Sequence, residues 1–367
     1  MMSQFADSIR NVRDYVRLPL LYDHWYVAGL CEEFDRTPKA RTLLERSIVF
    51  YRTLDGRLVA AQNRCLHRSF PLAEGYLEGD ELVCHYHGIR YDPEGTIVRI
   101  PSQKRCPDRK LRTYPIVEQG PFVFIWMGDQ DEPDFSRLPD LPFLSDSGFR
   151  TFHNSHHLDG SYLLMQENLN DLTHFSYLHR DSFGFDDSFL ELPTTVEETP
   201  EGASCYRVDN NPARATGALP PDIQERIAGR PAERWDGGLA ISPGVFKGYA
   251  PIKVGDPEAE DREIFSQYIM HYVTPESSTT THYWWSISND FGVDNDAYYE
   301  FMALTIKHGF DEDAWAVDHM QKVLDNDNFD YQELVIGGDK AGLLFRRIVL
   351  GWVEAEYGRT QATATQD

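Results

Sequence analysis

Cys65-Leu66-His67 and Cys84-His85-Tyr86-His87 are the two stretches that decide the fold of this chain. Each stretch contributes one Cys and one His as possible ligands, in the orders C-x-H and C-x-x-H, so the two residue types alternate along the chain. Thiolate and imidazole both bind transition metals, and two of each at this spacing predict a four-ligand site built from two loops.

Interleaved Cys and His are the ligand set of a Rieske [2Fe-2S] centre, in which one iron takes both thiolates and the other takes both imidazoles. A four-thiolate cluster would need four nearby cysteines, and the chain has five in all, widely spaced. Zinc is the alternative, since Cys2His2 sets also bind zinc, but zinc fingers pair Cys with Cys and His with His. Neither loop holds another Cys, so no disulfide can join the loops, and we expect a low-potential centre.

The residues around both loops are typical of short antiparallel strands. Asp55-Gly56 is a hairpin turn between two alternating segments, and Asp92-Pro93-Glu94-Gly95 is a turn that follows the second loop. The expected strands are residues 47–53, 57–61, 81–83, 96–100 and 122–127. The acidic stretch 128–134 then predicts a domain boundary.

A Rieske module needs roughly a hundred residues, so a chain of 367 residues has room for a second domain with its own core. Residues 167–179 carry its main motif, with Asp171, His174 and His179 on a segment whose apolar residues follow helical spacing. His174 and His179 would lie about 140° apart on an ideal helix, so they can share a metal only if the helix ends or bulges between them.

Two His and one carboxylate form the facial triad of non-haem Fe(II) oxygenases, which leaves coordination positions open for O2. A structural or solvated role is the alternative for the His pair. The third ligand must come from elsewhere, and the polar helical segment 313–333 offers several acidic residues. These are Asp318, Asp325, Asp327 and Asp330, most of which we expect on a solvated face.

Taken together, these motifs resemble the oxygenase (alpha) components of Rieske non-haem iron aromatic ring-hydroxylating oxygenases, of the vanillate O-demethylase, dicamba monooxygenase and phthalate dioxygenase types. The resemblance runs from His24 to the segment around Asp325. It implies that Asp325 is the third iron ligand beside His174 and His179. It also implies that the cluster ligands are Cys65, His67, Cys84 and His87. His85 departs from the family, where many relatives carry Pro, and we expect it to affect cluster exposure or potential.

The resemblance implies an α+β fold, with an all-β Rieske [2Fe-2S] domain followed by an α+β helix-grip catalytic domain that has an antiparallel sheet. The expected divisions are an N-terminal helical segment (1–23), the Rieske domain (24–135) and the catalytic mononuclear iron domain (136–367). It further implies a head-to-tail homotrimer in which Asp171 joins His174 to His87 of the adjacent chain. A carboxylate that accepts from both imidazoles fixes their tautomers; helix capping is the alternative role for Asp171.

The activity implied is that of a terminal oxygenase that hydroxylates or O-demethylates a small aromatic substrate, expected to be an aromatic acid. Its cofactors would be the [2Fe-2S] cluster and a mononuclear Fe(II), with electrons from NAD(P)H through a separate reductase or ferredoxin. A cis-dihydroxylating dioxygenase is the nearest alternative. A non-catalytic Rieske electron-transfer protein and a metal-stabilised binding protein are alternatives of other classes, although each leaves one motif unused.

Candidate substrate contacts are Asn168 in the iron motif and two residues in strand-like segments, His271 and Trp285. Packing within a sheet is an equally good explanation for His271 and Trp285. Residues 211–237 contain Pro and Arg with weak periodicity, which predicts a mobile loop over the site.

Composition excludes some partners. The net charge of −24 argues against nucleic acid and anionic membrane surfaces. We find no apolar run long enough to span a membrane and no secretory signal, so we expect a cytoplasmic protein. In that compartment the remaining cysteines, Cys31, Cys106 and Cys205, are expected to be free thiols.

Overall fold

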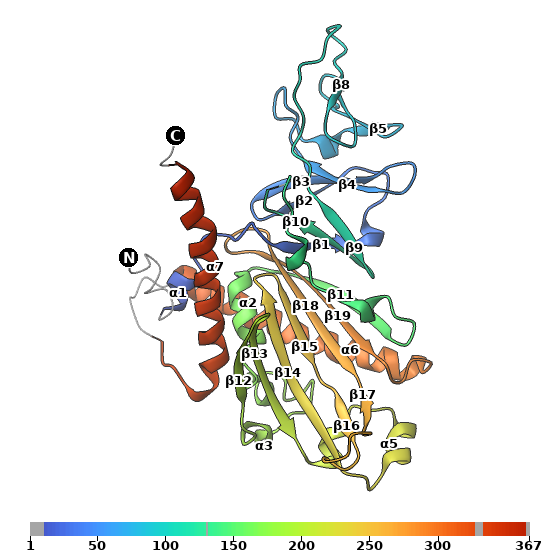
Figure 1. Ribbon diagram of the computed structural model, residues 1–367, viewed down its shortest axis with the longest axis vertical. Coiled ribbons are helices and arrows are strands. Elements are labelled where there is room, and N and C mark those ends of the chain that lie inside the picture. Colours follow the sequence, from blue (N-terminus) through green and yellow to red (C-terminus); the bar gives the residue numbers. More distant parts are fainter. Residues whose placement is uncertain (1–10, 130, 327–332, 365–367) are drawn as a thin grey trace. The chain divides into compact units, whose positions relative to one another are not determined.

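The computed structural model describes residues 11–129, 131–326 and 333–364, and the chain divides into two units (Figure 1). The first unit is Tyr22–Leu138 with Thr274–Ser277. The second unit holds Pro139–Val273 and the chain from Ser278 onward, together with the residues that precede Tyr22. Short helix α1 (Val12–Tyr15) therefore belongs to the second unit.

The first unit consists of three small antiparallel sheets. One has the strand order β1 (Trp25–Leu30), β10 (Phe122–Trp126), β9 (Ile116–Gln119), and the next has β2 (Lys39–Leu43), β3 (Arg46–Arg52), β4 (Leu58–Gln62). The third has β5 (Tyr76–Glu78), β6 (Glu81–Val83), β7 (Arg90–Tyr91), β8 (Ile97–Arg99). The all-β prediction for this part of the chain is confirmed, with strand ends within two residues of those expected.

Turn residues and a small core fix these hairpins. Gly56 and Gly95 have φ angles of 87° and 84°, in the left-handed region that glycine adopts without steric cost. Their core contains the side chains of Val49, Leu82 and Tyr91 and also the thiols of both loops. The two loops thus rest directly on the packed interior of the unit.

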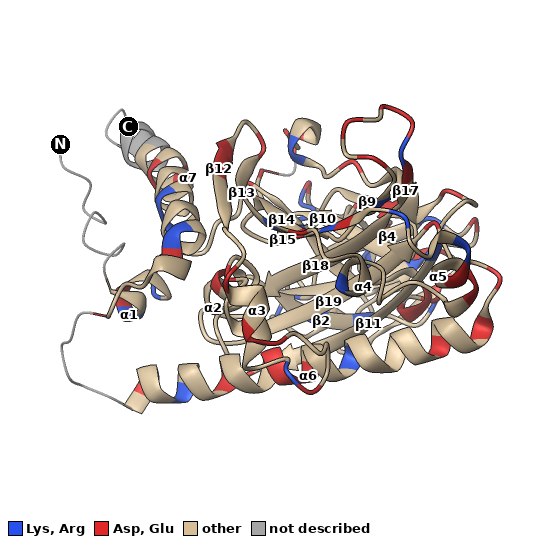
Figure 2. Ribbon diagram, turned by 90° about the horizontal axis from the view of Figure 1, so that it is seen from below, with Lys and Arg blue, Asp and Glu red and all other residues tan. Residues whose placement is uncertain are grey.

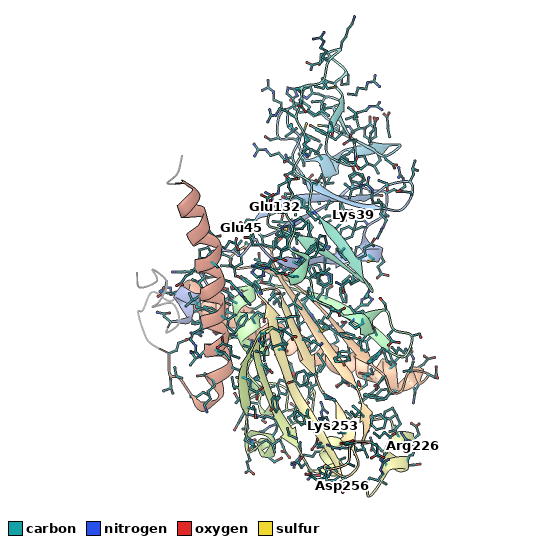
Figure 3. All side chains as sticks on the ribbon, in the orientation of Figure 1. Lys39, Glu45, Glu132, Arg226, Lys253 and Asp256 are labelled. Carbon is teal, nitrogen blue, oxygen red and sulfur yellow. The ribbon has the colours of Figure 1, made fainter. Side chains whose placement is uncertain are left out.

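The second unit is built on a nine-stranded antiparallel sheet. Its main path is β11 (Arg150–Leu158), β19 (Thr281–Asn289), β18 (Gln267–Pro275), β15 (Val245–Tyr249), β14 (Ala232–Ser242), β13 (Gly202–Asp209), β12 (Thr195–Thr199). Two short strands, β16 (Ile252–Val254) and β17 (Glu263–Phe265), continue from β14. Figure 3 labels Arg226 and Lys253 at this end of the sheet, where Arg226 forms an ion pair of 2.6 Å with Glu263.

Helices cover this sheet. They are α2 (Tyr162–Leu169), α3 (Asp187–Leu190), α4 (Pro212–Ala215), α5 (Pro221–Ile227), α6 (Asp296–Asn326) and α7 (Lys340–Ala364). Short 3-10 turns occur in both units, at Cys31–Glu33, Leu72–Glu74, Phe135–Arg137, Pro142–Leu144, His174–Ser176 and Gly337–Asp339. Helix α6 runs along one face of the sheet (Figure 2), where Phe310 packs 5.0 Å from His271 of β18 and 4.9 Å from Trp285 of β19 between ring centroids. None of the helices in the described ranges is long and apolar enough to cross a membrane.

Two expectations need correction here. The helix predicted over residues 167–179 ends at Leu169, with Asn170 as its C-cap. The segment 211–237 is not a loop throughout, because Pro212 and Pro221 begin helices α4 and α5, and Ala232 begins strand β14. Weak periodicity reflected the shortness of these helices, since four to seven residues make at most two turns.

Candidate cluster and metal site

The two loops of the first unit bury their thiols and expose their imidazoles. The side chains of Cys65 and Cys84 are 3% and 1% exposed, whereas His67 and His87 are exposed. The centroids of the two imidazole rings lie 4.6 Å apart. The loops thus present two buried thiols and two exposed imidazoles. This separation suits a Rieske centre, in which one iron binds both thiolates and the other binds both imidazoles.

Backbone hydrogen bonds hold both loops in tight turns. The Cys65 amide donates to the carbonyl of Phe70 at 2.9 Å, and the Cys84 amide donates to the carbonyl of Ile89 at 2.8 Å. Gly88, directly after His87, has a φ angle of 69° and donates back to the Cys84 carbonyl. A glycine is required here because the turn needs a left-handed residue.

Tyr91 supports the first loop and was not identified from the sequence. Its hydroxyl lies 3.2 Å from Cys65 Sγ and accepts a hydrogen bond from the Leu66 amide at 3.1 Å. Burial, followed by the contact with Cys65, raises the pKa of Tyr91, so the phenol stays protonated and can donate to a thiolate. The sequence alone offered little indication of this role, since a Tyr on a short strand, seven positions after Cys84, could equally pack in the core or face solvent.

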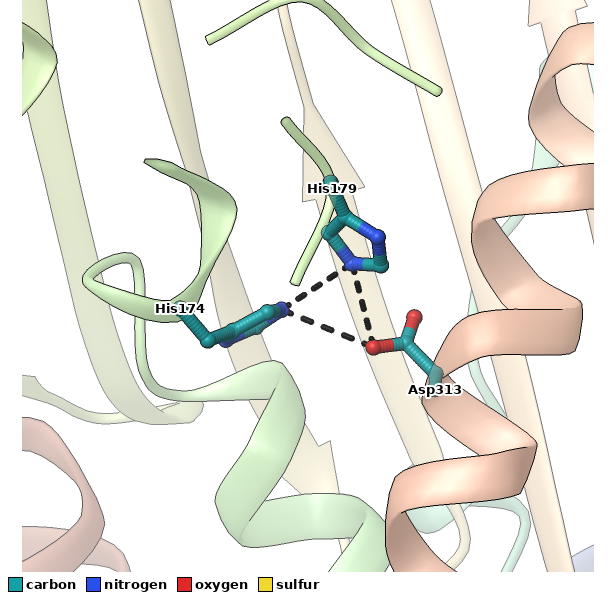
Figure 4. A group of neighbouring side chains, drawn as sticks. All are labelled: His174, His179 and Asp313. Atoms are coloured by element: carbon teal, nitrogen blue, oxygen red, sulfur yellow. Dashed lines mark hydrogen bonds and ion pairs between the residues drawn. The ribbon is translucent and has the colours of Figure 1, made fainter. Parts of the chain in front are cut away.

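In the second unit, His174, His179 and Asp313 converge (Figure 4). The two Nε2 atoms lie 3.2 Å apart, and Asp313 Oδ1 lies 3.1 Å from His179 Nε2 and 3.5 Å from His174 Nε2. Three ligands held at right angles about 2.1 Å from one ion would lie about 3 Å apart. The three atoms therefore fit one divalent transition metal on a single face.

His174 and His179 can converge because they do not lie on one continuous helix, which would place them about 140° apart. Helix α2 ends at Leu169, and the chain turns before the short 3-10 segment His174–Ser176. His179 then follows in irregular backbone whose Phe183 amide donates to the His179 carbonyl at 2.9 Å. Phe183 packs where Gly309 of α6 leaves room, since a Cβ at Gly309 would overlap the Phe183 ring.

The assignment of Asp325 as the third carboxylate is wrong in this structure. Asp325 is exposed near the end of α6 and accepts a hydrogen bond from Gln321 Nε2 at 3.0 Å. It follows Asp313 by more than three helical turns, which is about 18 Å along the axis. Asp318 accepts from the Asp159 amide instead, and Asp327 and Asp330 lie outside the described residues.

The helical spacing of apolar residues in α6 could have identified Asp313 from the sequence. The buried face of α6 is mostly apolar, and its members include Tyr299, Ile306, Phe310, Asp313, Val317, Gln321 and Leu324. An aspartate on such a face is 2% exposed here, and buried carboxylates need partners. A lone Asp within an apolar stripe was therefore the better candidate than the acids that follow it.

Electrostatics within the triad favour a metal. Burial pushes the pKa of Asp313 up, but hydrogen bonds and charge from the two His outweigh it, so the net pKa is below its usual value. Burial lowers the pKa of His174, partly offset by Asp313. Burial also opposes protonation of His179, but Asp313 and then Glu312 raise its pKa overall. The buried Asp313 carboxylate therefore favours a positive charge beside His179, which a metal ion would supply in place of a proton.

Two neighbours orient the triad. Asn168 Nδ2 donates to Asp313 Oδ1 at 2.7 Å, so Asn168, expected as a substrate contact, supports the carboxylate. Glu312 Oε2 lies 2.8 Å from His179 Nδ1 and accepts from Ser182 Oγ at 2.6 Å. Glu312 was missed, because nothing in the sequence tells which of two adjacent acids faces which neighbour.

Asp171 does not pair with His174 inside the chain. Its Oδ1 accepts hydrogen bonds from the amide and hydroxyl of Thr173, at 2.6 and 2.5 Å. His174 Nδ1 is buried and has no hydrogen-bond partner among the described residues. Burial lowers the pKa of His174, but a hydrogen-bonding contact with the Asp171 backbone opposes that shift, so the ring already faces the Asp171 main chain and lacks only a side-chain acceptor.

A cavity of about 880 Å³ adjoins the triad and lies within the second unit. All three triad residues line it, and much of the remaining lining is aromatic, from Phe175, Phe183, Phe185, Phe189, Phe246, Tyr249, Tyr298, Phe301 and Phe310. His271 lines the cavity as well. Trp285 does not: it is 1% exposed, and its Nε1 donates to His156 Nδ1 at 3.2 Å.

Comparison with known proteins agrees with this two-part organisation. Residues 24–115 match the Rieske [2Fe-2S] domain, and residues 158–355 match the vanillate O-demethylase oxygenase C-terminal domain. The chain is 31% identical over 316 residues to a putative toluene-4-sulfonate monooxygenase iron-sulfur subunit of Comamonas testosteroni, covering 83% of this chain and 89% of the relative.

Other relatives carry similar names. The dicamba O-demethylase oxygenase component of Stenotrophomonas maltophilia is 30% identical over 278 residues, covering 74% of this chain and 79% of the relative. Among solved structures, dicamba monooxygenase bound to 3,6-dichlorosalicylic acid superposes with a TM-score of 0.81 at 25% identity, covering 92% of this chain and 99% of that one.

Proposed function

Because the chain belongs to the Rieske non-haem iron oxygenases with a vanillate O-demethylase type C-terminal domain, we propose that it is a terminal oxygenase that hydroxylates or O-demethylates a small aromatic molecule. The observation that carries the proposal is the convergence of His174, His179 and Asp313 on one wall of an aromatic-lined cavity. Relatives named as demethylases and monooxygenases favour these reactions over cis-dihydroxylation.

Each metal group has a proposed set of ligands in this chain. Cys65, His67, Cys84 and His87 would hold the [2Fe-2S] cluster, and the triad would hold Fe(II). When bound, the cluster supplies single electrons and the iron supplies O2 activation. The electrons would come from NAD(P)H through a separate reductase or ferredoxin, as expected for an oxygenase component.

The protein groups have distinct tasks around the iron. Glu312 holds the Nδ1 side of His179, and Asn168 holds Asp313 Oδ1, so both ligands keep one orientation. The phenylalanine rings of the lining position an aromatic substrate by shape and exclude water from the reacting end. His179 would bind the metal through Nε2, which faces Asp313 Oδ1, and Glu312 Oε2 is placed to accept a hydrogen bond from a proton on Nδ1.

We also propose that the chain assembles as the head-to-tail homotrimer expected from the family resemblance. No side-chain acceptor is paired with the buried His174 Nδ1 among the described residues, and Asp171 is three positions away, with both of its described hydrogen bonds accepted by Oδ1. We expect Asp171 to turn toward both His174 and His87 of a neighbouring subunit on assembly. Electrons would then cross between subunits through this bridge.

Total iron and activity test the function directly. The purified, anaerobically reconstituted chain should contain about three irons and show a Rieske signal by electron paramagnetic resonance. With a reductase, NADH and a panel of aryl methyl ethers, it should consume O2 and release formaldehyde. Two irons without turnover would instead identify an electron carrier, and zinc without iron would identify a binding protein.

A further inference from the structure

Two guanidinium groups line the cavity, and each is paired with a buried carboxylate; burial raises the pKa of Asp236, and Arg234 opposes that shift. Arg214 pairs with Asp209 through two hydrogen bonds of 2.6 and 3.0 Å. Arg234 pairs with Asp236 at 2.8 Å. Asp209 and Asp236 are 6% and 5% exposed, so neither carboxylate can turn to solvent if its partner leaves.

No other Lys or Arg is among the described residues that line this cavity. An incoming carboxylate or sulfonate would have to compete for Arg214 or Arg234, and success would leave a buried Asp uncompensated. Asp186 adds a further carboxylate to the lining. The charge of the site therefore disfavours an anion.

The iron itself does not reverse this balance. Fe(II) held by two neutral imidazoles and Asp313 would carry one net positive charge. Glu312 lies 2.8 Å from His179 Nδ1 and offsets that charge from behind the ligand. The reacting end of the cavity is thus close to neutral once it is loaded.

His271 offers a neutral donor. Its Nδ1 lies 2.7 Å from the hydroxyl of Tyr283, which is fully buried. That hydroxyl has no other acceptor among the described residues, so it donates to Nδ1 and places the ring proton on Nε2. Burial lowers the pKa of His271 to about 3, which keeps the imidazole uncharged.

Space for a ligand atom exists at this nitrogen. Gly248 of β15 lines the cavity, and a Cβ there would lie 3.7 Å from His271 Nε2 and 2.8 Å from the carbonyl of Ile269. The glycine keeps the strand close and leaves the N–H open toward the cavity. One neutral donor among aromatic walls suits a carbonyl or ether oxygen.

We propose that the substrate is an uncharged aromatic molecule whose carbonyl or ether oxygen accepts a hydrogen bond from His271 Nε2, and that aromatic carboxylates and sulfonates are rejected. This rests on the proposed function, and it departs from the aromatic acid expected from the sequence.

Matched pairs of the same shape and different charge test the proposal. The iron-loaded enzyme, reduced and kept anaerobic, is titrated calorimetrically with 3-methoxybenzamide and 3-methoxybenzoate, and with the amide and acid of 2-naphthoic acid. Each amide should bind at least about tenfold more tightly than its acid. Equal or tighter binding of the acids, or no binding of either amide, overturns the proposal.

Two variants locate the cause. Asp236→Asn frees Arg234 and should improve benzoate binding about tenfold while changing benzamide binding little; Asp209→Asn does the same for Arg214 if the first variant does not fold. Glu263→Gln is the matched control, because Glu263 pairs with Arg226 and Arg230 outside the cavity lining. Unchanged benzoate binding in both aspartate variants contradicts the proposal.

His271→Phe tests the donor, and should reduce benzamide affinity about tenfold with no gain for benzoate. Benzamide affinity unchanged in His271→Phe would remove His271 from the proposal. Failure of the proposed function is distinguishable, because it would appear as a missing third iron and no O2-dependent product, whatever the order of affinities.

Discussion

Asp313 Oδ1 lies 3.1 Å from His179 Nε2, and this contact joins the buried face of helix α6 to an irregular segment much earlier in the chain. The two groups approach each other although burial disfavours charge on both. Such a pair is stable only with compensation, from a shared proton or from a metal.

The first prediction distinguishes Asp313 from Asp325. Asp313→Ala should reduce mononuclear iron from about one equivalent to below about a tenth and abolish turnover, because two imidazoles alone bind Fe(II) weakly. The Rieske spectrum should be unchanged, since the two sites share no ligand. Iron analysis and electron paramagnetic resonance measure both sites in one sample.

Asp325→Ala is the matched control on the same helix, since Asp325 is exposed and accepts a hydrogen bond from Gln321. It should keep its iron and its activity. Loss of iron in Asp325→Ala with retention in Asp313→Ala would restore the assignment made from the sequence.

The second prediction concerns Glu312, which acts through His179. Glu312→Gln should weaken Fe(II) binding about 10- to 100-fold, because the amide holds the Nδ1 side of the ring less strongly than a carboxylate does. Competition with a calibrated chelator at fixed pH measures the affinity. Glu300→Gln, an exposed acid on the same helix, should leave it unchanged.

The third prediction concerns the potential of the cluster. Tyr91→Phe removes a hydroxyl that lies 3.2 Å from Cys65 Sγ. A hydrogen bond to a thiolate stabilises the more negative, reduced cluster, so its loss should lower the midpoint potential by about 40 mV for about 1 kcal/mol. Protein-film voltammetry would measure the shift. Tyr76→Phe, at an exposed tyrosine of β5, serves as the control.

The fourth prediction tests electron transfer between subunits. His67→Ala chains should lack the cluster, and His174→Ala chains should lack the mononuclear iron, so each should be inactive alone. Co-expressed with different affinity tags and purified as mixed assemblies, they should regain part of the activity. Mixed assemblies that remain inactive would rule out the route between subunits.

Asp171→Asn examines the bridge in the same system. It should keep both metals but slow reduction of the iron site severely, because an amide cannot accept equally from two imidazole N–H groups. Rapid-mixing absorbance of the pre-reduced cluster after addition of O2 and substrate follows this step. Wild-type kinetics in Asp171→Asn would remove the bridging role.

The sequence by itself determined those parts of the fold and site that depend only on residues close together in the chain. The residues Cys65, His67, Cys84 and His87 lie in two short hairpin loops, where turn residues such as Gly95 fix the backbone within a few positions. Strand ends near them were therefore predictable to within two residues. The His174 and His179 pair was also recognisable, because its spacing within one short segment is part of the motif.

Only the tertiary structure decided which carboxylate completes the triad and which side chains face the cavity. Asp313 reaches His179 because α6 crosses the sheet in one register, and sequence spacing cannot fix the register of a helix against a distant segment. The same holds for His271 and Trp285, which are on adjacent strands of the sheet: His271 lines the cavity, while Trp285 packs against His156. Alternation gives the two faces of a strand, but long-range packing decides what each residue meets.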